Sequence, residues 1–173
     1  MNVVVCWAFG IGGVLANFII YQQKNRRALL TAKLIADILW TAHYSLLGAW
    51  SGAAVCGIGI LRETVFLNKH RKWADSKLWL AFFFLLSIVS ASLTWKNAFS
   101  ILPACASALS ILSFWIGKPK LTRVLQLPIS ISFLIYNIVS LSYTGMVNEV
   151  MTLSSLAVAW LRNSGKTTGR KAA

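Results

Sequence analysis

Apolar runs of helix length, separated by short polar gaps, take up most of this chain. A transmembrane helix needs about 20 apolar residues, because the hydrocarbon core is about 30 Å thick and a helix rises about 1.5 Å per residue. The pattern predicts an all-α, polytopic membrane protein with seven transmembrane helices. The runs cover residues 3–21, 28–49, 52–67, 77–95, 99–116, 124–143 and 146–161.

The gaps between these runs predict how the helices cross the membrane. Two gaps, WSG and TG, are so short that the helices beside them must form antiparallel hairpins. The gaps QQKNRR, NKHRKWADSK and GKPKLTR are basic, as is the tail RNSGKTTGRKAA, whereas the remaining gap holds one lysine, Lys96. Basic gaps stay on the cytoplasmic side of a membrane. We therefore expect the N-terminus outside and the C-terminus inside.

The composition supports this class of protein and argues against others. The chain of 173 residues is 57% hydrophobic and has a formal net charge of +13. A nucleic-acid binder needs a contiguous basic face, but apolar runs separate the basic residues here. We expect the lipid bilayer as a partner and no nucleic acid. The three cysteines lie far apart, and no nucleophile motif, phosphate-binding loop or metal-ligand spacing occurs, so we expect no enzyme, cofactor or metal site.

A weak internal repeat emerges when Gly52 is laid over Gly145. The first three runs then cover the last three, with similar gap lengths and gap charges. Two parallel units of three helices need one extra crossing between them. We expect a 3+1+3 arrangement in one transmembrane domain, followed by a disordered, basic cytoplasmic tail. The domain is 1–162, with repeat 1 at 3–70, the linker helix at 77–95 and repeat 2 at 98–162, and the tail is 163–173.

Polar and aromatic side chains form a stripe on the second run and another on the sixth. Both stripes follow helical spacing. Since an ionised group in lipid costs at least about 2.5 kcal/mol, we expect the stripes to face each other in the interior. The second run contributes Lys33, Asp37, Trp40, Tyr44 and Leu47, and the repeat equivalents are Gln126, Ser130, Phe133, Asn137 and Ser140.

The midpoint of these stripes is the candidate substrate site. Trp40 and Tyr44 present aromatic faces on which a flat solute can stack, and Asn137 can hydrogen-bond it. The candidate substrate-binding residues are Asp37, Trp40, Tyr44, Phe133 and Asn137.

Four charged residues on the second and third runs predict a buried ion-pair network. They are Lys33, Asp37, Arg62 and Glu63. A buried charge without a partner is expensive, so we expect these residues to pair. The pairs either only pin the helices together or take part in gating and substrate contact. Lys33 has a further alternative, which is to extend its ammonium group to the cytoplasmic interface.

Four other residues carry separate hypotheses. His43 is either a hydrogen-bonded packing residue or a proton relay. Glu149 either reaches the outer interface or closes an outer gate. Pro103 and Pro128 interrupt the fifth and sixth runs. Because a proline frees backbone carbonyls, both are candidate hinges.

Several of these residues also carry a family resemblance. The chain resembles the YgjV-like bacterial inner-membrane proteins, distant relatives of the SWEET and PQ-loop transporters. The resemblance implies a multi-pass protein of the bacterial inner (plasma) membrane and supplies no substrate. It rests on HYSLLGAWSGA at 43–53, on Arg62, on SILP at 100–103, and on Tyr136, Asn137, Ser142, Thr144, Gly145 and Glu149.

The likeness to SWEET transporters has two departures. Those proteins have a proline-glutamine pair after the first span, where this chain has Gln22 and Gln23. The repeat equivalent of Pro128 is Ile35. We expect a SWEET-like transporter or facilitator of a small polar solute, in which one three-helix unit rocks against the other. The alternative is a non-transporting membrane scaffold or accessory protein whose buried charges pair among themselves. The sequence leaves the oligomeric state open.

Overall fold

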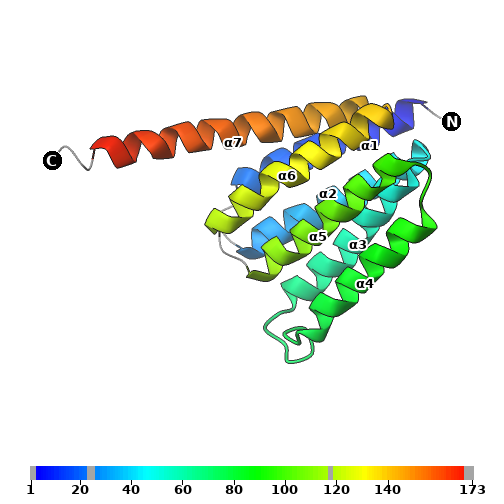
Figure 1. The fold of residues 1–173 in the computed structure, drawn as a ribbon, viewed down its shortest axis with the longest axis horizontal. Coiled ribbons are helices and arrows are strands. Elements are labelled where there is room, and N and C mark those ends of the chain that lie inside the picture. The colour runs from blue at the N-terminus through cyan, green and yellow to red at the C-terminus, as the bar shows by residue number, and fades with distance from the viewer. Residues whose placement is uncertain (1–2, 23–25, 117–118, 170–173) are drawn as a thin grey trace.

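Seven α-helices form the structure, a computed structural model that describes residues 3–22, 26–116 and 119–169 (Figure 1). No strand occurs among these residues, so the predicted all-α fold is confirmed. A short 3-10 turn, η1, leads into the fifth helix. The elements are α1 (Val3–Gln22), α2 (Arg26–Leu46), α3 (Trp50–Leu67), α4 (Leu78–Leu93), η1 (Ala98–Ser100), α5 (Ile101–Ile116), α6 (Pro119–Val139) and α7 (Tyr143–Gly169).

Several helices have the length and composition of membrane spans. Within the described residues, three are long and apolar enough to cross a bilayer: Val3–Ile20, Trp50–Leu67 and Ala98–Ile116. Leu78–Leu93 and Val124–Val139 are apolar but shorter. The predicted count of seven crossings therefore stays a prediction.

The C-terminal end differs from expectation. Residues 163–169 were expected in a disordered tail, but α7 continues through them to Gly169. Extending an existing helix avoids the cost of nucleation, and the chain has no proline after Pro128. Residues 170–173 of the expected tail lie outside the described residues.

The three helices before α4 and the three helices after it pack in the same order. Helix α2 packs between α1 and α3, and α6 packs between α5 and α7. The two sets of three also meet in matching pairs, because α1 packs on α7 and α5 packs on α3. Helix α4 packs on α3 and α5 at one side of the bundle (Figure 1). We call α1–α3 the first half and α5–α7 the second half.

The hairpin of the first half has a defined helix stop. Gly48 has a positive φ of 67°. Its N–H donates to the carbonyl of Ser45 at 3.1 Å, and the next N–H, of Ala49, donates to the carbonyl of Tyr44 at 2.9 Å. This is a Schellman motif, in which a left-handed residue lets two terminal carbonyls of the helix find donors. The motif ends α2 and turns the chain into α3.

The hairpin of the second half repeats this geometry with a different residue type. Leu141 has a φ of 54°. Its N–H donates to the carbonyl of Ile138 at 3.3 Å, and the N–H of Ser142 donates to the carbonyl of Asn137 at 2.9 Å. Leu141 is the residue that falls on Gly48 when Gly52 is laid over Gly145. A left-handed conformation costs a residue with a side chain roughly 1–2 kcal/mol.

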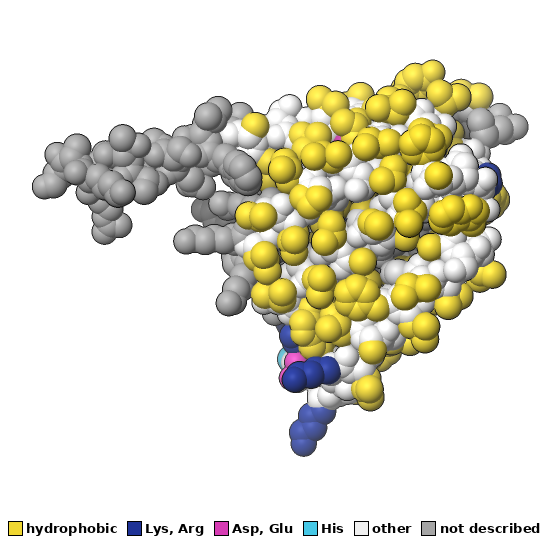
Figure 2. All heavy atoms as spheres, in the orientation of Figure 1, with side chains coloured by type: hydrophobic (Ala, Val, Ile, Leu, Met, Phe, Trp, Pro, Cys, Tyr) yellow, Lys and Arg dark blue, Asp and Glu magenta, His cyan; other side chains and the backbone are white. Residues whose placement is uncertain are grey.

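Apolar side chains cover the outside of the bundle, and polar ones are concentrated within it. Figure 2 shows a face that is largely hydrophobic, with lysine and arginine side chains grouped at its lower edge. Helix α4 illustrates the pattern, because Leu78 and Leu93 are 78% and 82% exposed while Ser87 is buried. This distribution is the reverse of that in a water-soluble protein and suits a lipid environment.

We predict that Leu141→Gly stabilises the protein. Glycine adopts the left-handed conformation without steric cost, and Leu141 is 65% exposed, so little packing is lost. The expected gain in unfolding free energy is about 0.5–1 kcal/mol, because glycine also raises the entropy of the unfolded chain. The measurement is the melting temperature of the detergent-purified protein.

The matched control is Gly48→Ala in the other hairpin. A Cβ there meets no other atom within 4 Å, so any loss of stability comes from the backbone conformation. We expect Gly48→Ala to lower the melting temperature. A lower melting temperature for Leu141→Gly would contradict the assigned turn.

Candidate functional site

The predicted stripe on α2 lies inside the bundle. Asp37, Trp40 and Tyr44 are all buried, and so is the neighbouring His43. Because these residues recur every three or four positions, one face of α2 turns inward along most of its length. Tyr44 stacks on Trp40 with ring centroids 5.7 Å apart and an angle of 29°.

A hydrogen bond joins the stripes of the two halves. Tyr44 on α2 donates its hydroxyl to Oδ1 of Asn137 on α6 at 2.7 Å, and both side chains are buried. Asn137 is the repeat equivalent of Tyr44. The structure therefore brings these two predicted site residues into direct contact.

A second link runs from α6 back to α3. The hydroxyl of Tyr136 accepts a hydrogen bond from the backbone N–H of Gly52 at 3.0 Å. A Cβ on Gly52 would lie 2.9 Å from the Tyr136 ring and 3.1 Å from the Tyr44 ring. Glycine at this position allows both rings to reach the start of α3. The tyrosine ring of α6 thus fills the space beside the α2–α3 hairpin.

A third link runs from α2 to the α6–α7 hairpin. Nδ1 of His43 lies 2.9 Å from the carbonyl of Cys6, which can only accept, so Nδ1 carries the proton and donates. Nε2 then accepts from the hydroxyls of Ser142 and Thr144, at 2.9 and 3.2 Å. Both ring nitrogens are engaged within the bundle. This arrangement favours the packing alternative for His43 over the proton relay.

The four charged residues form two ion pairs, one within α2 and one within α3. Lys33 pairs with Oδ1 of Asp37 one turn further along α2. Nη2 of Arg62 donates to Oε1 of Glu63 at 2.8 Å, and the guanidinium lies over the ring of Phe114 on α5 at 5.1 Å. Arg62, Glu63 and Asp37 are buried, whereas the Lys33 side chain is 24% exposed. The pairs lie inside the first half, not between the halves.

The remaining predicted acid lies inside the second half. Glu149 is buried and accepts a hydrogen bond from the amide of Asn148 at 2.8 Å. Ser130 on α6 lies near the Glu149 carboxylate. Asn148 in turn accepts from Asn17 on α1 at 2.8 Å. Glu149 therefore points inward and does not reach the interface.

Three other predicted residues are placed less centrally. Phe133 is half-buried, and among the described residues it makes no ring contact with Trp40 or Tyr44. Pro128 lies within α6 and is exposed. Pro103 is buried in the first turn of α5, where a backbone N–H is not needed for the helix. Pro103 therefore lies in the first turn of α5 and does not interrupt the helix.

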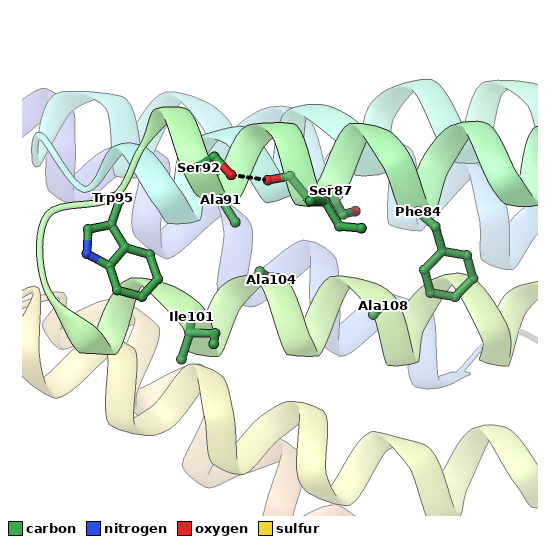
Figure 3. Close-up of a pocket in the computed structure, with 9 residues that line it drawn as sticks. Phe84, Ser87, Ala91, Ser92, Trp95, Ile101, Ala104 and Ala108 are labelled. Carbon is green, nitrogen blue, oxygen red and sulfur yellow. Dashed lines mark hydrogen bonds between the residues drawn. The ribbon is translucent and has the colours of Figure 1, made fainter.

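A crevice on the bundle surface is separate from this site. It has a volume of about 260 Å³ and lies between α4 and α5 (Figure 3). Its lining is mainly apolar: Phe84, Ser87, Ile88, Ala91, Ser92, Trp95, Ile101, Ala104 and Ala108. None of the predicted site residues lines it.

Sequence reasoning missed several partners of the stripe residues. Tyr136, Ser142 and Thr144 were noted only as motif positions, but each supplies a cross-half hydrogen bond. Their position could have indicated this role, because all three lie at or beside the α6–α7 hairpin, which is the repeat equivalent of the α2–α3 hairpin.

Comparison with known proteins gives one match. The model of the Imp-YgjV family, described as a bacterial inner membrane protein, matches residues 4–167. No curated protein and no solved structure matches the chain. The resemblance to SWEET transporters therefore stays a prediction.

We predict that Tyr44 and Asn137 are energetically coupled. In a double-mutant cycle of Tyr44→Phe and Asn137→Ala, measured by melting in detergent, the coupling energy should be about 0.5–1.5 kcal/mol, the usual net value of one hydrogen bond. Tyr143→Phe is the control, because Tyr143 is 58% exposed. Additive effects of Tyr44→Phe and Asn137→Ala would show that the bond contributes nothing.

Proposed function

Because the chain belongs to the Imp-YgjV family of bacterial inner membrane proteins, we propose that it works in that membrane as a transporter or facilitator of a small polar solute. The solute site lies between the halves, beside Trp40, Tyr44 and Asn137. The two halves are parallel repeats that rock against each other, as in other repeat-built transporters. We propose no catalytic role and no cofactor.

One observation carries the proposal: three of the contacts between the halves, made by Tyr44, Tyr136 and His43, lie together at one end of the bundle. Tyr44 and Asn137 lie in the last turns of α2 and α6, and Gly52 and Thr144 lie in the first turns of α3 and α7. In Figure 1 the helices spread toward the opposite end, where α7 and α4 point apart. This is the arrangement expected of a bundle whose halves are held most firmly at one end, although Asn17 with Asn148 and Arg62 with Phe114 also join them.

The links also have the reciprocity expected of repeats. His43 reaches the hairpin of the second half, and Tyr136 reaches the hairpin of the first. His43 and Tyr136 are repeat equivalents. The i,i+4 contact of Lys33 with Asp37 likewise has a counterpart in α6, where Nε2 of Gln126 donates to Ser130 at 3.1 Å. These correspondences support an axis between α2 and α6.

Unused hydrogen-bond donors support a polar solute. Among the described residues, Nε1 of Trp40 and Nδ2 of Asn137 are buried and have no hydrogen-bond partner. A buried donor without an acceptor costs roughly 1–3 kcal/mol. A solute with carbonyl, hydroxyl or carboxylate oxygens would satisfy such donors.

A second candidate function is a non-transporting scaffold. The observation in its favour is that Lys33 pairs with Asp37 and Arg62 with Glu63 inside one half. Such pairs need no solute to neutralise them. The ligand experiment below separates the two candidates.

We predict that the basic end faces the cytoplasm. In a Cys105→Ala background, a membrane-impermeant maleimide should label Lys96→Cys in intact spheroplasts. Lys72→Cys, in the basic loop between α3 and α4, should be labelled only after permeabilisation. Cys6 and Cys56 are buried and give a low background. Labelling of Lys72→Cys in intact spheroplasts would overturn the orientation.

We predict that a small polar solute stabilises the purified protein. Sugars, amino acids, organic acids and nucleosides are screened by thermal shift. A binder at a hundredfold excess over its Kd should add about 2.7 kcal/mol of stability. Asn137→Ala should abolish the shift, and Tyr143→Phe should retain it. If no compound acts and Asn137→Ala alone lowers the melting temperature sharply, the scaffold function replaces transport.

A further inference from the structure

The loop between α3 and α4 forms an exposed cationic surface at the edge of the bundle. Residues 68–77 contain four Lys or Arg residues and a single acid, Asp75. Arg71, Lys72 and Lys77 are exposed, and none of them forms an ion pair with another described residue. In Figure 2 lysine and arginine side chains gather at the lower edge, where Figure 1 places this loop. The surface therefore carries more positive charge than the loop itself neutralises.

The acids of the chain are engaged elsewhere. Nζ of Lys69 lies 3.7 Å from Oδ1 of Asp75 and 4.4 Å from the ring centroid of Trp115 on α5. Lys69 thus uses the one acid of the loop and holds the loop against α5. The other acids of the chain are buried among the helices: Asp37, Glu63 and Glu149. An anion that binds the exposed cations therefore has to come from outside the chain.

Backbone contacts fix the shape of this loop. The N–H of Arg71 donates to the carbonyl of Asn68 at 2.8 Å, and the N–H of Ala74 donates to the carbonyl of Arg71 at 3.0 Å. Ala74 is fully buried and anchors the loop to the bundle. Trp79 on α4 donates its indole N–H to the carbonyl of Trp73 at 2.7 Å. An anion can therefore bind here without the cost of ordering the loop backbone.

Outward-facing apolar side chains adjoin the cations. Trp73 is 48% exposed, and Leu78, the first residue of α4, is 78% exposed. The rings of Trp73 and Trp79 meet edge to face, with centroids 5.9 Å apart. Tryptophan is enriched where the hydrocarbon core of a membrane meets the head groups. Because the short segment 68–77 keeps its cations close to the ends of α3 and α4, the cations lie at head-group level when Leu78 contacts lipid.

We propose that the loop 68–77 binds the phosphate group of an anionic phospholipid. The guanidinium of Arg71 can donate to two phosphate oxygens, and Lys72 adds a second positive charge beside it. Trp73 and Leu78 contact the glycerol and the acyl chains of the same lipid. A nucleic acid or an acidic soluble protein would meet the same charges, but it would leave these two apolar side chains without hydrocarbon to contact.

This lipid site goes beyond the membrane orientation and the proposed transport. The tendency of basic loops to stay in the cytoplasm concerns insertion and needs no bound lipid. A site in the folded protein makes a further demand, namely that an anionic lipid stabilises the native state more than a zwitterionic lipid does. This demand is tested in detergent, so it holds for either orientation and without a solute.

The test is the melting temperature of the full chain in neutral detergent, titrated with phosphatidylglycerol or with phosphatidylcholine of the same acyl chains. At a hundredfold excess over its Kd, phosphatidylglycerol should raise the melting temperature by about 5–10 °C more than phosphatidylcholine. Its half-maximal concentration should rise roughly thirtyfold in the double variant Arg71→Gln with Lys72→Gln, because each charge contributes about fivefold. Sodium chloride at about 1 M should weaken the effect by screening the charges.

Two control variants separate the charge of this loop from net charge. The exchange Arg71→Lys with Lys72→Arg preserves both charges and should keep the wild-type midpoint. Lys96→Gln removes an exposed cation from the connection between α4 and α5 and should keep it as well. Without lipid, the double glutamine variant should melt at the wild-type temperature, because both side chains are exposed and form no ion pair with a described residue.

A second measurement uses the wild type alone. Phosphatidylglycerol with a photoreactive head group should cross-link to the peptide that contains residues 68–77, as mapped by mass spectrometry. Cross-links confined to other peptides would overturn the site. So would equal shifts with phosphatidylcholine, with inorganic phosphate at the same concentration or with a DNA duplex, or no shift with any of them. A phosphatidylglycerol effect unchanged in the double glutamine variant would also overturn it.

Discussion

Polar side chains buried in an apolar-coated bundle have to satisfy one another, and most of this structure follows from that constraint. Lipid offers no hydrogen bonds, so each inward polar group needs a partner on a neighbouring helix. Tyr44 hydrogen-bonds Asn137. His43 hydrogen-bonds a backbone carbonyl on α1 and two hydroxyls at the α6–α7 hairpin. These bonds have few alternatives, so they specify which helix lies beside which. Apolar contacts alone would leave that choice open, since one lipid-compatible surface resembles another.

The hairpins decide where those bonds form. A left-handed residue ends α2 at Gly48 and α6 at Leu141, and each following helix starts at once. The short turns place the last turn of one helix against the first turn of the next, so the polar residues of both gather at the same end of the bundle. The opposite end has the long connection between α3 and α4, which carries several basic residues. The hydrogen bonds of Tyr44, Tyr136 and His43 therefore gather at one end of the molecule, and this basic loop lies at the other.

Hydropathy and helical spacing predicted the helices, the inward face of α2 and the contact of Lys33 with Asp37, because these depend on residues close together in the chain. Other features depend on distant residues. The partners of His43 lie in a turn with no pattern of its own, and the placement of Asp37 against Gly59 requires the packing of two helices. Pro103 was expected to interrupt a helix, because a hydropathy pattern does not locate the first turn, where the structure places it. Residues 163–169 are polar, yet they extend α7.

Gly59 also constrains how the sequence can change. The Asp37 carboxylate occupies the volume that any side chain at 59 would need. A homologue with a larger residue at 59 must therefore turn the Asp37 carboxylate to another rotamer or carry a smaller residue at 37. The residues at positions 37 and 59, on α2 and α3, should therefore vary together across evolution.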